Sequence, residues 1–282
     1  MIPEASVLVW RTKAPWSDNR LVEQDLLLSR AVVEIFSEAV IREGLAFRGG
    51  TALHKLHLAR AWRYSEDVDL VQIQPGPIGK IAGAIRDRLD PWLGSPRYTR
   101  NAGRVTLVYR FETEMPPVLP SRLKLEVNTR EHFSVLGMRT IPFRVENPWF
   151  TGGAEVTTYP IEELLGTKLR ALYQRKKGRD LFDLWAALEE GRSVPERIIA
   201  CFRRYLEAAG QKISRAEFEA NLAGKIGDPA FLADVRPLLA AGIAFDPVPA
   251  AARVRTALIA RLPGEAWKGG KAGDPKGLAP GK

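Results

Sequence analysis

Two aspartates, Asp67 and Asp69, are the best placed for chemistry in this sequence, because they stand two positions apart in a stretch that alternates polar and apolar residues. That alternation predicts a half-buried strand over residues 67–73, with both carboxylates on one face. Neighbouring carboxylates repel unless a cation lies between them. Mg²⁺ prefers oxygen ligands and binds one or two carboxylates together with substrate phosphates. The pair therefore predicts a magnesium site, and the alternative is a solvated acidic sheet edge.

A glycine-rich turn, Gly49-Gly50-Thr51, ends sixteen residues before Asp67. We expect a strand over residues 45–47 to lead into it, and a helix over residues 52–60 to follow with Thr51 as its N-cap. Free N–H groups at a helix start attract anions, and glycine allows close approach of a phosphate. The turn is thus a candidate phosphate site, although Gly-Gly also occurs in ordinary tight turns. It lacks the spacing of an ATPase P-loop.

A third carboxylate, Glu126, fits the same scheme. Residues 122–128 alternate as a strand does, and Glu126 faces away from the apolar positions. If this strand neighbours residues 67–73, Glu126 completes a three-carboxylate cluster that can hold two cations. Alternation alone would also place an ordinary exposed glutamate there.

Lys168 stands in the apolar stripe of a helix expected over residues 161–175. It must either extend to solvent or meet negative charge, which a nucleoside triphosphate or the carboxylate cluster would supply. Asp180 and Asp183 open the next helix. Asp180 lies near that helix's apolar edge, where it could cap the helix, pair with Lys168 or act as a base on an incoming hydroxyl.

The elements that position these residues predict an α+β protein. We expect an irregular arm over residues 1–20, a long helix over 21–42, a helix over 78–93, and strands over 104–112 and 122–128, with an edge strand over 141–145. Beyond Tyr159-Pro160 the pattern is almost wholly helical. We therefore predict a core domain over residues 1–158, a helical domain over 159–262 and a disordered tail, rich in Gly, Pro and Lys, over 263–282.

Bulk properties narrow the class of partner. The 282 residues carry a formal net charge of +9, which favours a polyanion such as nucleic acid, although an Arg-rich codon bias explains the charge equally well. The basic run from Arg170 to Arg179 is either a solvated helix end or a phosphate-binding edge for RNA. The single cysteine, Cys201, fits a reducing compartment and a packing role. No signal peptide or membrane span is evident, so we expect a cytoplasmic protein without a membrane partner.

In combination and order, these motifs resemble the AbiEii/AbiGii toxin family of nucleotidyltransferases, which includes the MenT toxins. The matching segments cover residues 45–190: they are Phe47-Arg48-Gly49-Gly50-Thr51-Ala52-Leu53-His54-Lys55, Arg63-Tyr64-Ser65-Glu66-Asp67-Val68-Asp69-Leu70, Lys124-Leu125-Glu126, Lys168-Leu169-Arg170-Ala171 and Arg179-Asp180-Leu181-Phe182-Asp183-Leu184.

The resemblance implies a polymerase-β-like nucleotidyltransferase core, a mixed sheet flanked by helices, followed by an all-helical domain. It implies a toxin of a toxin–antitoxin or phage-defence pair, with a cognate antitoxin, that transfers a nucleotide from an NTP to RNA. For some members the acceptor is the 3′ end of tRNA, and translation is inhibited.

Residue by residue, the resemblance implies that Gly49, Gly50 and Thr51 hold the triphosphate and that Asp67 and Asp69 hold Mg²⁺. Lys55 and Arg63 would contact phosphate or support the site. Lys168 would bind the triphosphate and Asp180 would assist catalysis. Asp183 belongs to the same motif, so only helix geometry favours Asp180.

Two other classes of function stay open at this point. One is nucleotide transfer to a small molecule or a protein side chain, against which the basic charge argues mildly. The other is a catalytically silent module that binds RNA or the antitoxin, and the intact Asp67, Asp69 and Lys168 argue against it. The sequence does not specify the nucleotide, the acceptor, the antitoxin or the oligomeric state.

Overall fold

The computed structural model describes residues 2–269, which form two compact units. The sheet unit contains the chain up to Leu164 together with Arg236–Ala244. The helical unit contains Leu165–Val235 and the described chain from Phe245 onward. The disorder predicted for residues 263–282 falls mostly on residues 270–282, which lie outside the described residues.

A seven-stranded mixed sheet is the centre of the sheet unit, with the strand order β3-β4-β5-β2-β1-β7-β6. The pairs β5–β2 and β1–β7 are parallel, and the other four pairs are antiparallel. The strands are β1 (Leu45–Arg48), β2 (Asp67–Gln72), β3 (Arg97–Asn101), β4 (Arg104–Glu112), β5 (Pro120–Asn128), β6 (Arg139–Asn147) and β7 (Phe150–Thr158).

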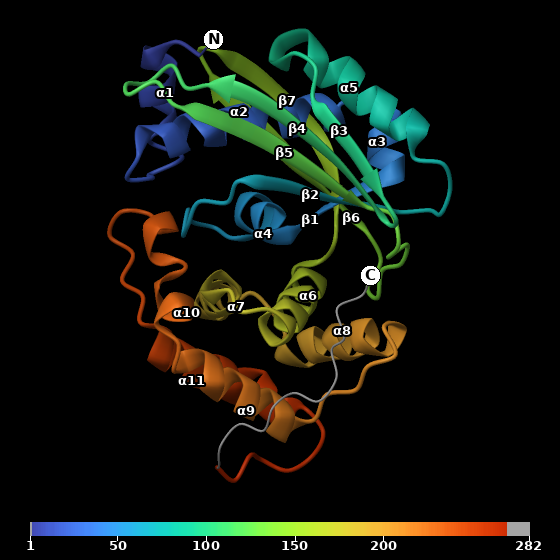
Figure 1. Ribbon diagram of the computed structural model, residues 1–282, viewed down its shortest axis with the longest axis vertical. Coiled ribbons are helices and arrows are strands. Elements are labelled where there is room, and N and C mark those ends of the chain that lie inside the picture. The colour runs from blue at the N-terminus through green and yellow to red at the C-terminus, as the bar shows by residue number, and fades with distance from the viewer. Residues whose placement is uncertain (1, 270–282) are drawn as a thin grey trace. The chain divides into compact units, whose positions relative to one another are not determined.

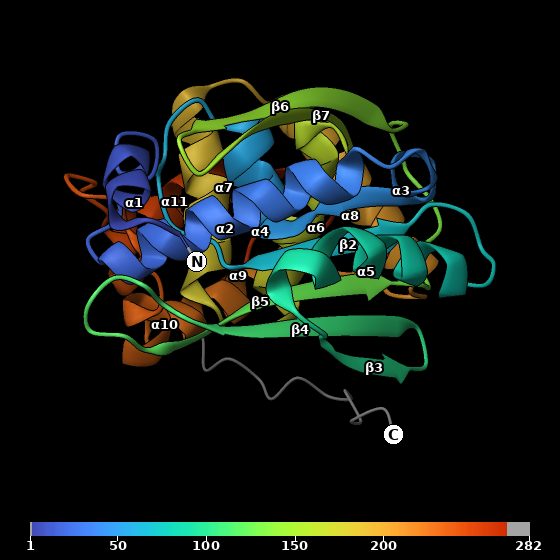
Figure 2. The same cartoon turned by 90° about the horizontal axis from the view of Figure 1, so that it is seen from above.

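One face of the sheet is covered by α2 (Asn19–Phe36), α3 (Ala39–Gly44) and α5 (Gly79–Leu93), as Figures 1 and 2 show. The covered face buries the apolar half of each alternating strand, including Val68, Leu70 and Leu125. A short helix α1 (Glu4–Trp10) packs on α2. Helix α4 (Gly49–Ala52) begins where β1 ends and continues as a π-helical turn, η1 (Leu53–His57).

The segment Arg236–Ala244 completes the sheet unit from far along the sequence. It includes the 3₁₀ turn η2 (Arg236–Leu238) and pairs with the chain between η1 and β2. The Tyr64 N–H donates to the Leu238 carbonyl at 2.8 Å, and the Ala240 N–H donates to the Trp62 carbonyl at 3.0 Å. The sheet unit is therefore discontinuous in sequence.

The helical unit is built on α6 (Ile161–Gln174), which begins in the sheet unit, and α7 (Gly178–Glu190). It continues with α8 (Pro195–Ala208), α9 (Arg215–Ile226), α10 (Pro229–Ala233), α11 (Pro247–Ala257) and the 3₁₀ turn η3 (Ile259–Arg261). Local capping explains several starts: Ser214 and Glu217 form a capping box, and Asp228 and Asp246 cap helices that open with proline. Cys201 is buried, as its predicted packing role requires.

The structure corrects several sequence predictions. The arm contains α1, and the long helix breaks at Ser37-Glu38 into α2 and α3. Strands β3 and β7 were not predicted, because β3 is polar and exposed along its length and β7 carries Gly152-Gly153. A Cβ at Gly152 would lie 2.8 Å from the Phe150 ring, so a larger residue there would require the ring to shift. No helix among residues 2–269 is long and apolar enough to cross a membrane.

Candidate active site

Asp67 and Asp69 lie on β2, as the alternation predicted, and their neighbours come from the two adjacent strands. Asp69 is in register with Arg48 on β1 and with Glu126 on β5. Asp67 is in register with Lys124 on β5. Because residues in register share a face of the sheet, the strand order brings both aspartates, Glu126 and Lys124 together. The strands over residues 67–73 and 122–128 are therefore neighbours, which is the condition under which Glu126 was expected near the two aspartates.

The carboxylate of Asp67 is crowded by negative charge. The pKa of Asp67 is raised to about 6, chiefly by burial and also by the charges of Asp69, Glu66 and Glu126, which together outweigh the lowering effect of Lys124. Lys124 Nζ lies 3.7 Å from Asp67 Oδ2 and 2.8 Å from Glu126 Oε2, so one ammonium serves two carboxylates. The side chains of this face leave negative charge that a further cation would stabilise.

Gly49 is packed directly against the second aspartate. Its φ of +80° lies in the left-handed region, and a Cβ at this position would come within 2.2 Å of Asp69 Oδ2. Glycine is thus required twice, for the backbone turn and for room beside the carboxylate. The first N–H groups of α4 and the Asp69 carboxylate therefore stand side by side.

Thr51 does not cap the helix, contrary to the sequence prediction. The helix begins two residues earlier, with Arg48 in the N-cap position. The Thr51 hydroxyl instead donates to the Asp67 carbonyl at 2.6 Å and contacts the Ser65 hydroxyl at 2.9 Å. The reason is the turn at Gly49, which carries the chain from β1 straight into the helix. Thr51 therefore ties the glycine turn to the start of β2.

Glu126 stands beside Asp69 in register but is held by cations of its own strand and of β4. Its carboxylate lies 2.8 Å from Lys124 Nζ and 3.1 Å from Arg104 Nε. Among the residues that the structure describes, no three His, Cys, Asp or Glu side chains are grouped so that they could hold a metal ion. A role for Glu126 as a metal ligand stays a prediction.

A cavity of about 300 Å³ lies on this face and exposes residues that the sequence did not single out. Arg130 donates from Nη2 to the Ala102 carbonyl at 2.6 Å and packs against Gly103, at the turn between β3 and β4. No sequence motif marks Arg104 or Arg130 as a site residue, because only strand pairing brings the turn between β3 and β4 close to Asp69. The cavity lining comprises Arg48, Asp69, Leu70, Asn101, Ala102, Gly103, Arg104, Glu126, Asn128 and Arg130.

Lys55 and Arg63 lie at a different place in the sheet unit. Lys55 Nζ contacts the Asp25 carboxylate at 2.9 and 3.0 Å and Ser29 Oγ at 2.9 Å. Arg63 is 2% exposed and donates from Nη1 to the Tyr64 carbonyl. Both line a second cavity, which shares no lining residue with the cavity beside Asp69.

Lys168 meets negative charge within the helical unit. Its Nζ lies 2.8 Å from Asp183 Oδ2 and 3.3 Å from Asp180 Oδ1, and both aspartates are fully buried. Arg175 binds Asp180 through two further contacts of 2.6 and 2.8 Å. Burial alone would raise the pKa of Asp180, but Lys168 and Arg175 outweigh it and hold the pKa below its usual value.

Much of the basic run from Arg170 to Arg179 is engaged in ion pairs of the helical unit. Lys176 pairs with Asp228, and Arg179 lies 3.2 Å from Asp234. Lys177 lies 3.7 Å from the same carboxylate. These pairs tie α7 and the turn before it to residues near α10, which favours a structural role over a free phosphate-binding edge.

The residues around Asp67 and Asp69 fit a divalent cation. The donors are carboxylate oxygens, the type that Mg²⁺ prefers. The raised pKa of Asp67 reflects the burial and like charge that such an ion would relieve. Lys124 already places one cationic group among the carboxylates. Asp67 and Asp69 are thus the pair that would hold the ion.

Solved structures of low sequence identity share this fold. MenT4, a nucleotidyltransferase toxin of Mycobacterium tuberculosis H37Rv, is 18% identical, with a TM-score of 0.65 over 92% of this chain and 90% of that one. JHP933 of Helicobacter pylori is 17% identical, with a TM-score of 0.52 over 86% of this chain and 91% of that one. No curated protein sequence matches the chain.

The mixed sheet flanked by helices is thus the fold of a nucleotidyltransferase toxin of known structure. The family model described as nucleotidyl transferase AbiEii toxin, type IV TA system, matches residues 30–258. The chain belongs to this family of nucleotidyltransferase toxins, which act within type IV toxin–antitoxin systems. The α+β fold and the family predicted from the sequence are both confirmed.

Proposed function

We propose that this toxin transfers a nucleotide from an NTP to the 3′ end of an RNA, specifically tRNA, with release of pyrophosphate. The acceptor hydroxyl would attack the α-phosphorus of the NTP. A tRNA blocked at its 3′ end cannot be aminoacylated, so translation would stop until the antitoxin intervenes. Both the NTP and tRNA are abundant in the cytoplasm, where we place the protein.

The observation that carries this proposal is the imbalance of charge at Asp67 and Asp69. Lys124 contacts both Asp67 and Glu126, yet burial and the charges of Asp69, Glu66 and Glu126 leave the pKa of Asp67 raised to about 6. When bound there, Mg²⁺ would neutralise the phosphate oxygens and lower the pKa of the attacking hydroxyl. A site that only bound RNA phosphates would have no use for two aspartates facing the ligand.

The other residues of the sheet unit would position the NTP. The first N–H groups of α4, at Gly49, Gly50 and Thr51, suit the triphosphate oxygens. Gly49 leaves no side chain between those groups and Asp69. Arg104 and Arg130, at the rim of the cavity beside Asp69, would balance the charge of the leaving pyrophosphate. Positioning and electrostatics would supply most of the rate.

Lys168 and Asp180 would serve the same reaction from the helical unit, as the family resemblance implies. Their support is the buried network itself, since a lysine held between two buried aspartates is well fixed in position. Both oxygens of Asp180 are engaged by cations, which suits a residue that positions Lys168 better than one that accepts a proton. Asp183 makes the shorter contact with Lys168 and is the alternative for this role.

The test is incubation of the purified protein with Mg²⁺, total RNA and each labelled NTP in turn. Label on a tRNA-sized band with one or two NTPs, lost in Asp69→Ala, is the expected result. Glu66→Ala is the matched control, because Glu66 is an exposed carboxylate next to Asp67. Label that survives Asp69→Ala would refute the assignment of the site.

The same experiment separates the other functions. Label on the protein would move the acceptor to a side chain. No label in any lane, with the protein folded, would instead favour a small-molecule acceptor or a silent binding module.

A further inference from the structure

A third cavity, of about 680 Å³, lies in the sheet unit where β4 and β5 extend beyond the beginning of β2. The pairing of β2 with β5 begins at Asp67 and Lys124, so residues 120–123 of β5 have no neighbour in β2. The first turns of α2 also line this cavity. It shares no lining residue with the two cavities described above.

The third cavity and the cavity beside Asp69 lie on either side of Lys124 along β5. Arg122, Lys124 and Glu126 are alternate residues of this strand, so they share one face of the sheet. Glu126 lines the cavity beside Asp69, Lys124 contacts Asp67, and Arg122 lines the third cavity. Alternate residues of a strand are about 7 Å apart. A few nucleotides are therefore long enough to extend from Asp67 into the third cavity.

Two arginines face each other at the third cavity. Arg110 on β4 is in register with Arg122 on β5, and both side chains are exposed. Among the described residues, no carboxylate lies within ion-pair distance of either guanidinium. Glu66 and Glu112 also border the cavity, and neither pairs with these arginines. Like charges directly opposite each other on adjacent strands are unfavourable, and an anion bound between them would offset the repulsion.

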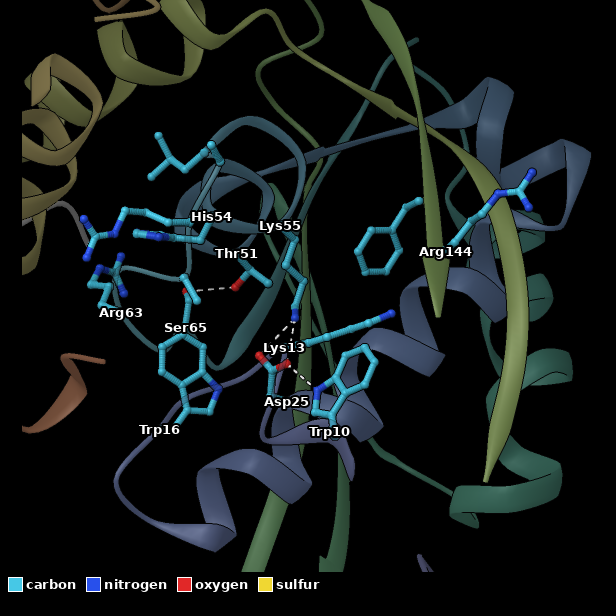
Figure 3. Close-up of a pocket in the computed structure, with 15 residues that line it drawn as sticks. Trp10, Lys13, Trp16, Asp25, Thr51, His54, Lys55, Arg63, Ser65 and Arg144 are labelled. Carbon is cyan, nitrogen blue, oxygen red and sulfur yellow. Dashed lines mark hydrogen bonds and ion pairs between the residues drawn. The ribbon is translucent and has the colours of Figure 1, made fainter. Parts of the chain in front are cut away.

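The cavity drawn in Figure 3 differs in this respect. At its centre Lys55 and the Trp10 indole N–H bind the Asp25 carboxylate, each at 2.9 Å. The charges of Lys55 and Asp25 are therefore satisfied within the protein. Arg110 and Arg122 have no such carboxylate among the described residues, so their charges are available to a ligand from outside.

Apolar side chains also line the third cavity, among them Leu21, Val108 and Pro120. A nucleotide unit of RNA combines an anionic phosphate with a base whose faces pack on apolar or aromatic side chains. A cavity that contains both arginines and apolar side chains suits this combination. Its volume lies within the roughly 300–1,000 Å³ of sites for drug-sized ligands, which is enough for a nucleotide unit.

We propose that the third cavity binds the 3′-terminal strand of the acceptor RNA, with Arg110 and Arg122 on its backbone phosphates and its 3′ hydroxyl at Asp67. A guanidinium binds phosphate oxygens through two parallel N–H donors. The NTP would then occupy the cavity beside Asp69, so donor and acceptor would approach the aspartates from opposite sides. The choice of RNA as ligand rests on the proposed nucleotidyl transfer, whereas the first test measures RNA binding alone.

The first test uses the full-length protein and a short single-stranded RNA with a 5′ fluorophore, without NTP, and measures fluorescence anisotropy at several salt concentrations. Arg110→Gln/Arg122→Gln removes both cations. Lys80→Gln/Arg100→Gln is the matched control, because both residues are exposed and Arg100 projects from β3 toward the opposite face of the sheet. We expect the first variant to bind RNA about fivefold or more weakly and its salt slope to fall by about 1.4. No RNA binding by the unmodified protein, or an equal loss in both variants, would overturn the proposal.

Steady-state kinetics of nucleotide transfer separate this inference from the proposed function. We expect Arg110→Gln/Arg122→Gln to raise the KM for RNA about fivefold or more and to leave the KM for the NTP unchanged. A rise in the KM for the NTP alone would refute the assignment of this cavity to the acceptor. If the unmodified protein binds RNA through these arginines but transfers no label, the proposed function fails and the RNA-binding cavity stands.

Discussion

The molecule contains two pairs of aspartates, and they are treated in opposite ways. In the helical unit Asp180 and Asp183 are fully buried, yet Lys168 and Arg175 bind them and hold the pKa of Asp180 low. On β2, the pKa of Asp67 instead rises to about 6, because burial and the charges of Asp69, Glu66 and Glu126 outweigh the lowering effect of Lys124. The protein thus stabilises the ionised form of Asp180 and disfavours the ionised form of Asp67.

This difference separates a carboxylate pair that stabilises the fold from one that is available to bind. Carboxylates that are already paired with Lys168 and Arg175 have little charge left to bind a metal cation. A carboxylate with a raised pKa, such as Asp67, destabilises the metal-free protein when it is ionised, and a bound cation would offset that cost. Four measurements can break or sharpen this comparison, and the largest effect is expected in the helical unit.

Removal of Lys168, the cation between Asp180 and Asp183, should strongly reduce the stability of the protein. Lys168→Met leaves Asp180 and Asp183 buried with one cation fewer, and we expect a loss of about 3–5 kcal/mol of unfolding free energy. Urea denaturation measures it. Lys212→Met, at an exposed lysine of the same unit, is the control and should change stability by less than about 0.5 kcal/mol. If both substitutions change the unfolding free energy equally, Lys168 does not stabilise the buried Asp180 and Asp183.

Addition of Mg²⁺ should stabilise the protein through the sheet unit. At about a hundred times the dissociation constant, binding adds about 2.7 kcal/mol to the unfolding free energy. Thermal unfolding with Mg²⁺ and with EDTA measures the gain. The gain should vanish in Asp67→Asn/Asp69→Asn. If the double variant keeps it, the ion binds elsewhere.

Gly49→Ala should disturb the site more than a strained turn alone would. The new methyl would meet the Asp69 carboxylate, and the backbone at φ +80° is unfavourable for alanine. We expect about 2–3 kcal/mol of destabilisation. Gly94→Ala is the matched control, since its φ is +75° with open space around it, so it carries the strain without the contact. A smaller loss in Gly49→Ala than in the control would show that Asp69 moves aside freely.

Asp67→Asn should stabilise the metal-free protein, the opposite sign to Lys168→Met. The raised pKa of Asp67 means that its ionisation costs stability as the pH rises from its unfolded value near 3.8 through about 6. Its side chain is 34% exposed, so we discount the shift for solvent screening and expect about 1 kcal/mol.

Unfolding in EDTA at several pH values measures this gain. The variant's advantage should be present in full above pH 6 and disappear toward pH 4. If the stability gain of Asp67→Asn does not change with pH, the ionisation of Asp67 is not its cause.

The sequence predicted those features that depend on local pattern. The alternation around Asp67 and Asp69 and in residues 104–112 identified the strands, and the motif order identified the family. Features set by distant contacts were missed. Arg104 and Arg130 reach the site only through strand pairing, and the space beside Gly152 on β7 is limited by Val33 of α2, far away in the sequence. Helix periodicity also could not show that Lys55 turns to Asp25, thirty residues earlier.

The segment Arg236–Ala244 has a consequence for how the protein is made. Because it hydrogen-bonds to Trp62 and Tyr64, the sheet unit is complete only after the ribosome has synthesised residue 244. A chain truncated near residue 160 would keep every strand and both aspartates, and still lack the partner of this stretch. Nascent toxin therefore reaches its full sheet unit late in translation, when most of the helical unit has already emerged.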